Sequence, residues 1–163
     1  MTIVVTADHG ELLWDNVALD QEAFFGDRCV DHGGTPYEAL ARVPLLSEDL
    51  PTRLDDGAPV SLIDLAPTHL SAIGVEPRSR TSGVDLHADD HDPRSLLVEG
   101  CLGPEERKAV YRDGDKLIAS ESGATLTFDL PDETPAEFDS ARIEALRSQL
   151  PPWPCGEAGS TDV

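Results

Sequence analysis

The sequence predicts an α/β fold in which a parallel α/β layer (residues 1–75) precedes a small antiparallel sheet with a helix (residues 96–150). Three observations predict it: a β-branched run opens the chain, a helical pattern ends at a glycine, and two strand patterns joined by Asp-Gly precede a last helix. Alternating strands and helices are typical of a parallel layer, and consecutive strands of an antiparallel one. We expect residues 76–95 to form an irregular connection and residues 151–163 a loose tail.

The first predicted element is a buried parallel strand at residues 2–7, where Val, Ile and Thr form a short continuous run. Asp8 and His9 follow at its carboxyl end, where open α/β sheets bind their ligands. A neighbouring carboxylate and imidazole can both reach one divalent cation, or one each of two neighbouring cations. Gly10 would let the chain turn away and leave both side chains facing a site. The alternative interpretation is a strand that ends in a polar turn.

A long loop and a short helix are predicted next. Residues 11–34 mix polar and aromatic residues, and a loop of this length inside a compact domain is usually functional or covers a site. Thr35 then serves as an N-cap before Pro36, at the first helical position. A strand begins near Val43, because Pro44 is tolerated at a strand start.

The rest of the sequence predicts two helices and four short strands. A helix at residues 61–73 has Leu and Ile at near-helical spacing and Gly74 as its C-terminal stop. Pro67 would kink this helix or divide it in two. Asp113-Gly114 predicts a hairpin turn. The remaining expected elements are strands at 96–98, 109–112, 116–119 and 125–128, and a helix at 138–150.

The charge of the chain excludes two classes of partner. The 163 residues include 32 acidic residues against two lysines and ten arginines, and the net charge is −20. Such a surface repels nucleic acid and anionic membranes, so we expect neither as a partner. The acidic residues are spread along the chain, and high salt would screen their mutual repulsion. The composition therefore favours a salt-adapted protein from a halophile.

Cysteine usage and hydropathy favour a cytoplasmic location. The three cysteines have no close pairing and form no disulfide framework or zinc-type spacing. The first residues lack the pattern of a signal peptide, and no apolar run approaches the length of a membrane span.

A series of motifs occurs in a fixed order over residues 2–138. Asp-His-Gly-Glu stands at 8–11, His-Gly at 32–33, Tyr-Glu at 37–38 and Arg-Val-Pro-Leu at 42–45. The series continues at residues 60–68, 73–75, 83–86, 112–118 and 127–133. This ordered set resembles the sulfatase branch of the alkaline-phosphatase-like hydrolases, and ordered co-occurrence is more specific than any single motif.

The resemblance implies the C-terminal part of an alkaline-phosphatase-like (sulfatase) α/β/α sheet. Sulfatases are several hundred residues long, and their N-terminal part carries an Asp-Asp metal pair and a Cys-x-Pro-x-Arg or Ser-x-Pro-x-Arg nucleophile. Neither pattern is present, and Cys29, Cys101 and Cys155 stand in other contexts. We therefore interpret the sequence as a fragment without the nucleophile half.

The resemblance also implies roles for the polar residues near the first strand. Asp8 and His9 would be metal ligands, and His32 matches a histidine that binds a second metal or the ester oxygens. His32 could instead protonate a leaving alkoxide as the catalytic general acid. Glu11 is expected to orient His9 from outside the metal's ligands, next to Gly10. The resemblance implies a divalent metal cofactor, Mn²⁺, Zn²⁺ or Ca²⁺. Carboxylate with imidazole suits Mn²⁺, Zn²⁺ or Fe²⁺ more than Ca²⁺, and calcium sulfatases more often have Asp-Asn at this point.

Other polar residues have structural interpretations that outweigh functional ones. His69 lies in an apolar helical stretch, which is typical of a histidine at the edge of a core. His87 and His91 lie in an acidic stretch that fits a solvated loop better than a metal site. Arg42 could pair with an anion, but its place beside the Val-Pro step favours a structural ion pair. Gly33-Gly34 would let the backbone approach an anion closely.

These observations predict a metal-dependent hydrolase of small anionic sulfate or phosphate esters, inactive as this chain alone. The alternative is an inactive sulfatase-fold remnant, or an interaction module that needs a partner chain. Half a sheet would expose an apolar edge, which predicts aggregation, a missing N-terminal half, or a second copy as partner. A phosphoglycerate-mutase-like metalloenzyme would share Asp-His but lack Arg-Val-Pro-Leu and the late hairpin.

Overall fold

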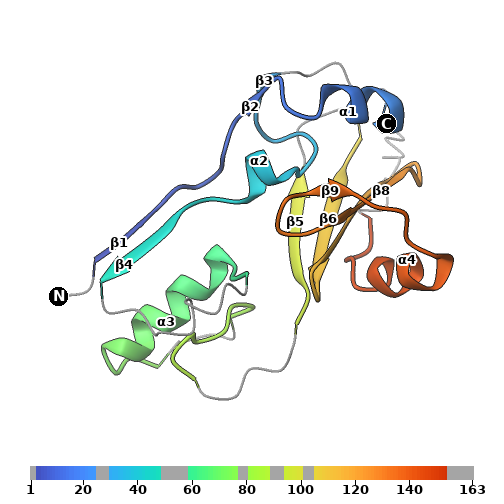
Figure 1. Ribbon diagram of the computed structural model, residues 1–163. Helices are drawn as coiled ribbons and strands as arrows, with labels where there is room; N and C mark the ends of the chain where they lie inside the picture. Colours follow the sequence, from blue (N-terminus) through green and yellow to red (C-terminus); the bar gives the residue numbers. More distant parts are fainter. Residues whose placement is uncertain are drawn as a thin grey trace, which may run out of the picture.

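The computed structural model describes residues 3–24, 30–48, 59–76, 81–88, 94–100 and 105–153. These residues form a mixed α/β protein with few helices (Figure 1). Its strands are β1 (Ile3–Thr6), β2 (Leu12–Leu13), β3 (Val30–Asp31), β4 (Leu45–Glu48), β5 (Leu96–Gly100), β6 (Arg107–Arg112), β7 (Asp115–Ser120), β8 (Thr125–Asp129) and β9 (Thr134–Pro135). Its helices are α1 (Val17–Phe24), α2 (Glu38–Ala41), α3 (Leu65–Ala72) and α4 (Ser140–Arg147), with the 3-10 turn η2 (Leu62–Asp64) before α3.

The predicted small antiparallel sheet is confirmed. Five strands pair in the order β5-β6-β7-β8-β9, and each pairs antiparallel with its neighbour. The β6–β7 hairpin turns at Asp113 and Gly114, whose φ angles of 52° and 87° explain the Asp-Gly pair. All four strands expected in this part of the chain lie within β5 to β8 or overlap them.

Each face of this sheet is covered by a different part of the chain. Side chains alternate between the faces along each strand. One face packs against the segment that carries α1 and α2, and its core includes Leu12, Phe24, Tyr37, Leu40, Ala109, Ile118 and Phe128. The opposite face packs against α4, and its core is formed by Val110, Leu117, Ala119 and Leu146. Residues of the first predicted part (1–75) and of the last (96–150) thus pack into the same core. The division of the chain at these boundaries stays a prediction.

The two longer predicted helices are confirmed in shortened form. The Asp139 side chain accepts a hydrogen bond of 2.8 Å from the Arg142 amide and caps α4. The other helix is divided into η2 and α3, and Pro67 lies in the first turn of α3, where its missing N–H costs no hydrogen bond. Gly74, at φ 69°, ends α3 as predicted.

The prediction of a buried parallel strand at residues 2–7 is wrong in both respects. β1 pairs antiparallel with β4 in a two-stranded ribbon, and the relative exposure of Ile3 is 43% and of Val5 54%. Neither core cluster of described residues includes a side chain of β1. A β-branched run indicates a strand, but burial depends on what packs on the strand, and a short apolar run does not contain that information.

The predicted loop at residues 11–34 contains β2, α1 and β3, so that prediction is also wrong. Asp20 faces the core from α1 and accepts a hydrogen bond of 2.5 Å from the Thr35 hydroxyl. This buried polar side chain interrupts the apolar periodicity that would have indicated a helix. Because its hydroxyl is used there, Thr35 is not an N-cap: α2 begins at Glu38, after Tyr37.

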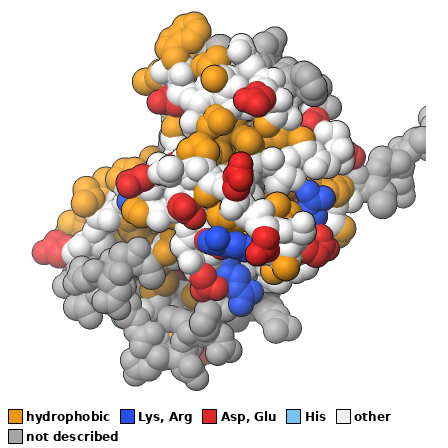
Figure 2. All heavy atoms as spheres, turned by 45° about the vertical axis from the view of Figure 1, so that its right-hand side comes forward, with side chains coloured by type: hydrophobic (Ala, Val, Ile, Leu, Met, Phe, Trp, Pro, Cys, Tyr) orange, Lys and Arg blue, Asp and Glu red, His pale blue; other side chains and the backbone are white. Residues whose placement is uncertain are grey.

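The described surface carries scattered charge. On the face in Figure 2, acidic side chains are distributed between apolar patches, and the Lys and Arg side chains lie next to acidic ones. Among the described residues, no helix is long and apolar enough to cross a membrane.

Candidate metal centre

The segment that carries Asp8 to Glu11 leaves β1 and lies against α2. The Gly10 amide donates a hydrogen bond of 2.8 Å to the Leu40 carbonyl. A Cβ added at Gly10 would lie 1.9 Å from the Ala39 carbonyl oxygen, so only glycine allows this close approach. The glycine therefore serves close packing against α2, and the residues on either side of it are held in place by that contact.

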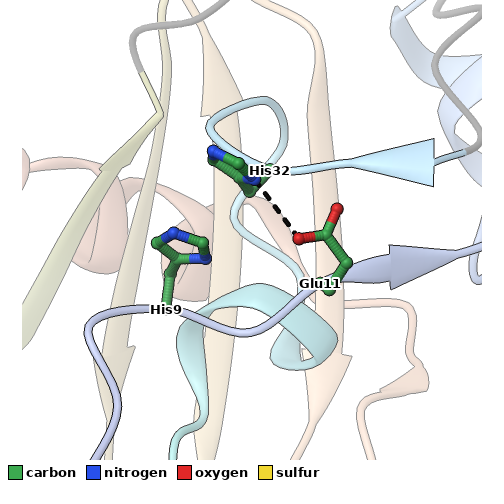
Figure 3. Close-up of side chains that lie close together, drawn as sticks. All are labelled: His9, Glu11 and His32. Atoms are coloured by element: carbon green, nitrogen blue, oxygen red, sulfur yellow. Dashed lines mark hydrogen bonds and ion pairs between the residues drawn. The ribbon is translucent and has the colours of Figure 1, made fainter.

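His9, Glu11 and His32 come together beside this contact (Figure 3). One potential ligand atom of each residue lies within 4.8 Å of those of the others. The two imidazole rings stack with their centroids 4.2 Å apart and an interplanar angle of 22°. The Nδ1 of His32 lies 3.2 Å from Glu11 Oε2. Two segments, one after β1 and one after β3, thus supply the three side chains, and Glu11 and His32 are 21 residues apart in the sequence.

Hydrogen bonding fixes the tautomer of His9. Its Nδ1 lies 2.7 Å from the Gly10 carbonyl oxygen, which only accepts, so Nδ1 carries the proton. The Nε2 lone pair is then directed away from the backbone, which is the arrangement of metal-binding histidines that donate their other ring N–H to a carbonyl. The same hydrogen bond holds the pKa of His9 above its ordinary value of 6.5.

Asp8 lies beside His9 but outside the three-residue cluster. Its side chain is 88% exposed, and Oδ2 lies 3.7 Å from His9 Nε2. The hydrogen bond that Oδ1 accepts from the His9 amide, 3.0 Å long, lowers the pKa of the Asp8 carboxyl below its ordinary value. Asp8 and His9 are thus close enough for one cation to contact both, and a shared cation stays a prediction. Glu11, expected to orient His9, instead contacts His32.

The loop that carries His32 is anchored to the five-stranded sheet. Gly33 has a φ of 80°, and the Gly34 carbonyl would lie 1.8 Å from a Cβ at Gly100 on β5. Arg107 on β6 donates to the Thr35 hydroxyl in the same loop. This close backbone packing places the His-Gly-Gly loop against the sheet edge.

The donor set fits a divalent metal that takes nitrogen and oxygen ligands. Two imidazoles and one carboxylate are ligands of Zn²⁺, Mn²⁺ and Fe²⁺, and fewer oxygens are present than Ca²⁺ prefers. Ligand atoms about 2.0–2.2 Å from one ion lie at most about 4.4 Å apart. The separations of up to 4.8 Å are slightly larger than this, and the two stacked rings lie in nearly parallel planes, so the side chains must reorient for their lone pairs to meet at one ion.

His69 and His87 contact residues of their own segments, and Arg42 contacts a residue far away in the sequence. His69 Nδ1 lies 2.6 Å from the Leu65 carbonyl, one helical turn earlier, which agrees with a histidine at the edge of a core. His87 contacts Asp85 of its own loop at 3.3 Å. Arg42 donates to the Pro131 carbonyl at 3.2 Å, so its structural partner is a backbone oxygen rather than a carboxylate. His91 and all three cysteines lie outside the described residues.

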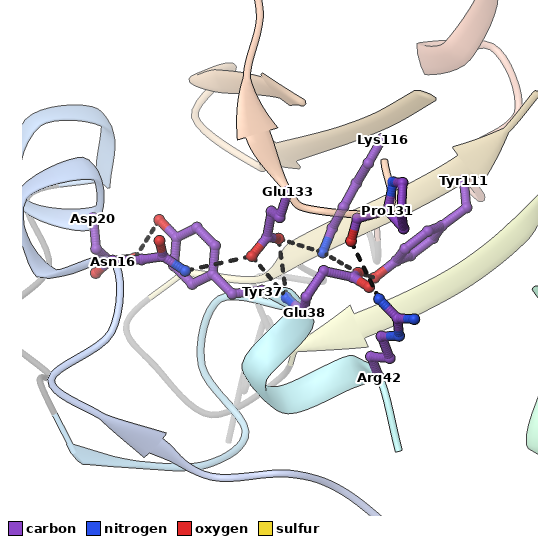
Figure 4. Close-up of polar contacts among 9 residues, drawn as sticks. All are labelled: Asn16, Asp20, Tyr37, Glu38, Arg42, Tyr111, Lys116, Pro131 and Glu133. Carbon is purple, nitrogen blue, oxygen red and sulfur yellow. Dashed lines mark hydrogen bonds and ion pairs between the residues drawn. The ribbon is translucent and has the colours of Figure 1, made fainter. Parts of the chain in front are cut away.

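A buried charge network beneath α2 was not predicted from the sequence. Lys116 on β7 has no exposed surface, and its Nζ lies 2.9 Å from Glu38 and 2.6 Å from Glu133 (Figure 4). The Tyr111 hydroxyl donates to the same Glu38 oxygen at 2.8 Å. A lysine within a β-branched and apolar strand pattern was the available signal, because a buried lysine needs carboxylate partners.

Comparison with protein-family models, curated proteins and solved structures finds no match to this chain.

Proposed function

We propose that this chain is the metal-binding half of an alkaline-phosphatase-like, sulfatase-type hydrolase of small anionic esters. The observation that carries the proposal is the His9–Glu11–His32 cluster, in which a backbone carbonyl holds the proton of His9 on Nδ1. The ordered series of motifs at 8–11, 32–33, 37–38 and 42–45 supports the same function.

A bound divalent ion would polarise a sulfuryl or phosphoryl oxygen and lower the pKa of a nucleophile. The chain's own residues would hold that ion and the anion. His9 and Glu11 would supply ligands, and Asp8 lies near enough to His9 to add a third. His32 either completes the ligand set or donates a proton to the leaving oxygen, and its contact with Glu11 would orient the ring in both roles.

Binding of the anionic group tests this function directly. The Mn²⁺-loaded chain should broaden the ³¹P signal of methyl phosphate beyond what free Mn²⁺ does at the same concentration. Methyl sulfate should compete if the site accepts both esters. His9→Ala and His32→Ala should abolish the broadening, while His87→Ala, which removes another partly exposed histidine beside a carboxylate, should not. Bound Mn²⁺ without any effect on the phosphate would contradict the proposal.

Turnover by the chain alone gives a second test. The sequence contains no Cys-x-Pro-x-Arg or Ser-x-Pro-x-Arg motif, so we expect no measurable hydrolysis of aryl sulfates or phosphates. Clear metal-dependent hydrolysis that His9→Ala removes would contradict the interpretation as a half site and would locate a nucleophile within these residues.

One observation favours a second candidate function, an interaction module that pairs with another copy of the chain. Val5 and Leu46 face each other across the β1–β4 ribbon, and their relative exposures are 54% and 66%. Each strand of this ribbon pairs with only one other described strand, and an exposed apolar edge strand is a template for strand pairing. Sedimentation should then show a concentration-dependent dimer that Val5→Lys with Leu46→Lys abolishes. A monomer at all concentrations would contradict this alternative.

A further inference from the structure

We propose that Lys116 is a positioning residue for the candidate ligands His9 and Glu11, acting through α2. The proposal rests on the proposed metal site for one of its two readouts, metal affinity. Its other readout, the protection of one backbone amide, is independent of any metal.

The first link joins the sheet to α2. The fully buried Lys116 ammonium lies between Glu38 Oε1 at 2.9 Å and Glu133 Oε1 at 2.6 Å. The two Glu133 oxygens in turn accept from the Glu38 amide at 2.9 and 3.0 Å. Tyr37, at the N-cap of α2, supplies no side-chain hydrogen bond to the helix. Glu133 therefore replaces the missing cap, and Lys116 holds Glu133 in place (Figure 4).

The second link joins α2 to the ligands. The Leu40 carbonyl of α2 accepts the Gly10 amide at 2.8 Å, and the Ala39 carbonyl lies where a Cβ of Gly10 would be. Gly10 stands between His9 and Glu11 in the chain, so a shift of α2 moves both ligands. His32 follows β3, whose ladder with β2 ties it to Glu11, and Arg107 holds the same loop to the sheet through Thr35. A shift of α2 would therefore move His9 relative to His32 instead of moving the cluster as a unit.

The chain contains a matched control for this role. Its only other lysine, Lys108, is 2% exposed and points to the opposite face of the sheet. Its Nζ lies 3.0 Å from Glu99 and 3.1 Å from the Pro152 carbonyl, and 4.8 Å from the centre of the Trp153 ring. Lys108→Met and Lys116→Met therefore each remove one buried ammonium, but only Lys116→Met affects the face that carries α2.

The experiment compares the full chain with Lys116→Met and Lys108→Met. Zn²⁺ affinity is measured by calorimetry. Hydrogen exchange of the Gly10 and Glu38 amides is measured by NMR, and each rate is compared with the rate expected from global unfolding of the same variant. We expect Lys116→Met to weaken Zn²⁺ binding about 10- to 100-fold, as loss of the groups that orient metal ligands does. In Lys116→Met, both amides should exchange faster than global unfolding of this variant explains. Lys108→Met should change the Zn²⁺ affinity by no more than about twofold, well below the loss expected for Lys116→Met.

Three outcomes would overturn the proposal: unchanged affinity in folded Lys116→Met, equal losses in both lysine variants, or unchanged protection of the Gly10 amide. If the unsubstituted chain binds no Zn²⁺, the proposed function is contradicted, and Gly10 exchange alone decides the role of Lys116. If Lys116→Met does not fold, Glu133→Gln takes its place in the same comparison, because it keeps the side-chain volume and weakens the pair with Lys116.

Discussion

At the scale of single residues, the arrangement of the candidate ligands depends on the absence of a side chain at Gly10. Gly10→Ala would put Cβ 1.9 Å from the Ala39 carbonyl, so the segment must move away from α2. We expect a loss of about 1–3 kcal/mol in the free energy of unfolding, the usual cost of overpacking, together with weaker metal binding. Denaturant titration and calorimetry measure the two effects.

Gly114→Ala provides the control for that substitution. Gly114 has a φ of 87° and nothing within 4 Å of its Cβ position, so the substitution strains the hairpin without a clash. It should cost about 1–2 kcal/mol of stability and leave metal affinity unchanged. Equal metal affinities of Gly10→Ala and the unsubstituted chain would show that the contact with α2 does not position the ligands.

Two buried tyrosines, Tyr37 and Tyr111, make the stability of the folded state decrease at alkaline pH. Burial, reinforced by Asp20 beside Tyr37 and by Glu38 beside Tyr111, raises the pKa of both phenols above their ordinary value of 10.0. The folded state therefore favours the protonated phenols. Their stabilisation is complete below about pH 10 and is lost as the pH rises further, because the unfolded chain releases these protons first.

Denaturant unfolding between pH 8 and 11.5 measures this loss. Tyr37→Phe and Tyr111→Phe should each reduce the alkaline slope by up to about 1.4 kcal/mol per pH unit. Tyr111→Phe should also cost about 1–2 kcal/mol at pH 8, because it removes a hydrogen bond to the Glu38 carboxylate. Slopes that are the same in all three proteins would contradict this account of the phenols.

The sequence indicated part of the candidate site and not the rest, for a geometric reason. The residue types and neighbours of Asp8, His9 and His32 suit metal chemistry, and the structure places the two histidines in contact. The partnership of Glu11 with His32 follows from the two-residue ladder of β2 and β3. A ladder this short has no periodicity to read in the sequence.

At the scale of elements, patterns were informative where one face of the element is buried. β6 and β7 alternate between two cores, and a turn with positive φ angles joins them, so both strands and their hairpin were predictable. The sequence does not predict α1, because a buried Asp20 interrupts its apolar pattern. β1 was recognised as a strand, but its antiparallel partner β4 lies about forty residues away, and pairing over that distance leaves no local signal.

The difference between ribbon and sheet is measurable in stability. Val5→Thr and Leu46→Thr change exposed side chains of the β1–β4 ribbon and should alter the free energy of unfolding by less than about 0.5 kcal/mol. Ile118→Val, at a fully buried position on β7, should cost about 0.5–1.5 kcal/mol. Urea denaturation measures all three, and a larger loss at Val5 than at Ile118 would show that the ribbon is covered in solution.

At the scale of the whole molecule, the net charge of −20 opposes the compact state. We propose that high salt relieves this repulsion, as in a halophilic protein. The Debye length falls from about 10 Å at 0.1 M salt to about 3 Å at 1 M. The free energy of unfolding should therefore rise over this range of KCl. The same series near the pI of about 4.3, where the net charge vanishes, should have little effect. A stability at neutral pH that is independent of KCl would contradict the proposal.

The central claim is that His9, Glu11 and His32 together bind one divalent ion, and a calorimetric titration with Zn²⁺ at pH 8 and high salt tests it most directly. We predict one site per chain, which His9→Ala and His32→Ala each abolish or weaken at least about tenfold. Glu11→Gln should weaken it, and His87→Ala should leave it unchanged. Asp8→Asn shows whether Asp8 adds a ligand. A folded chain that binds no Zn²⁺, or binds it equally well without His9 and His32, would contradict the claim.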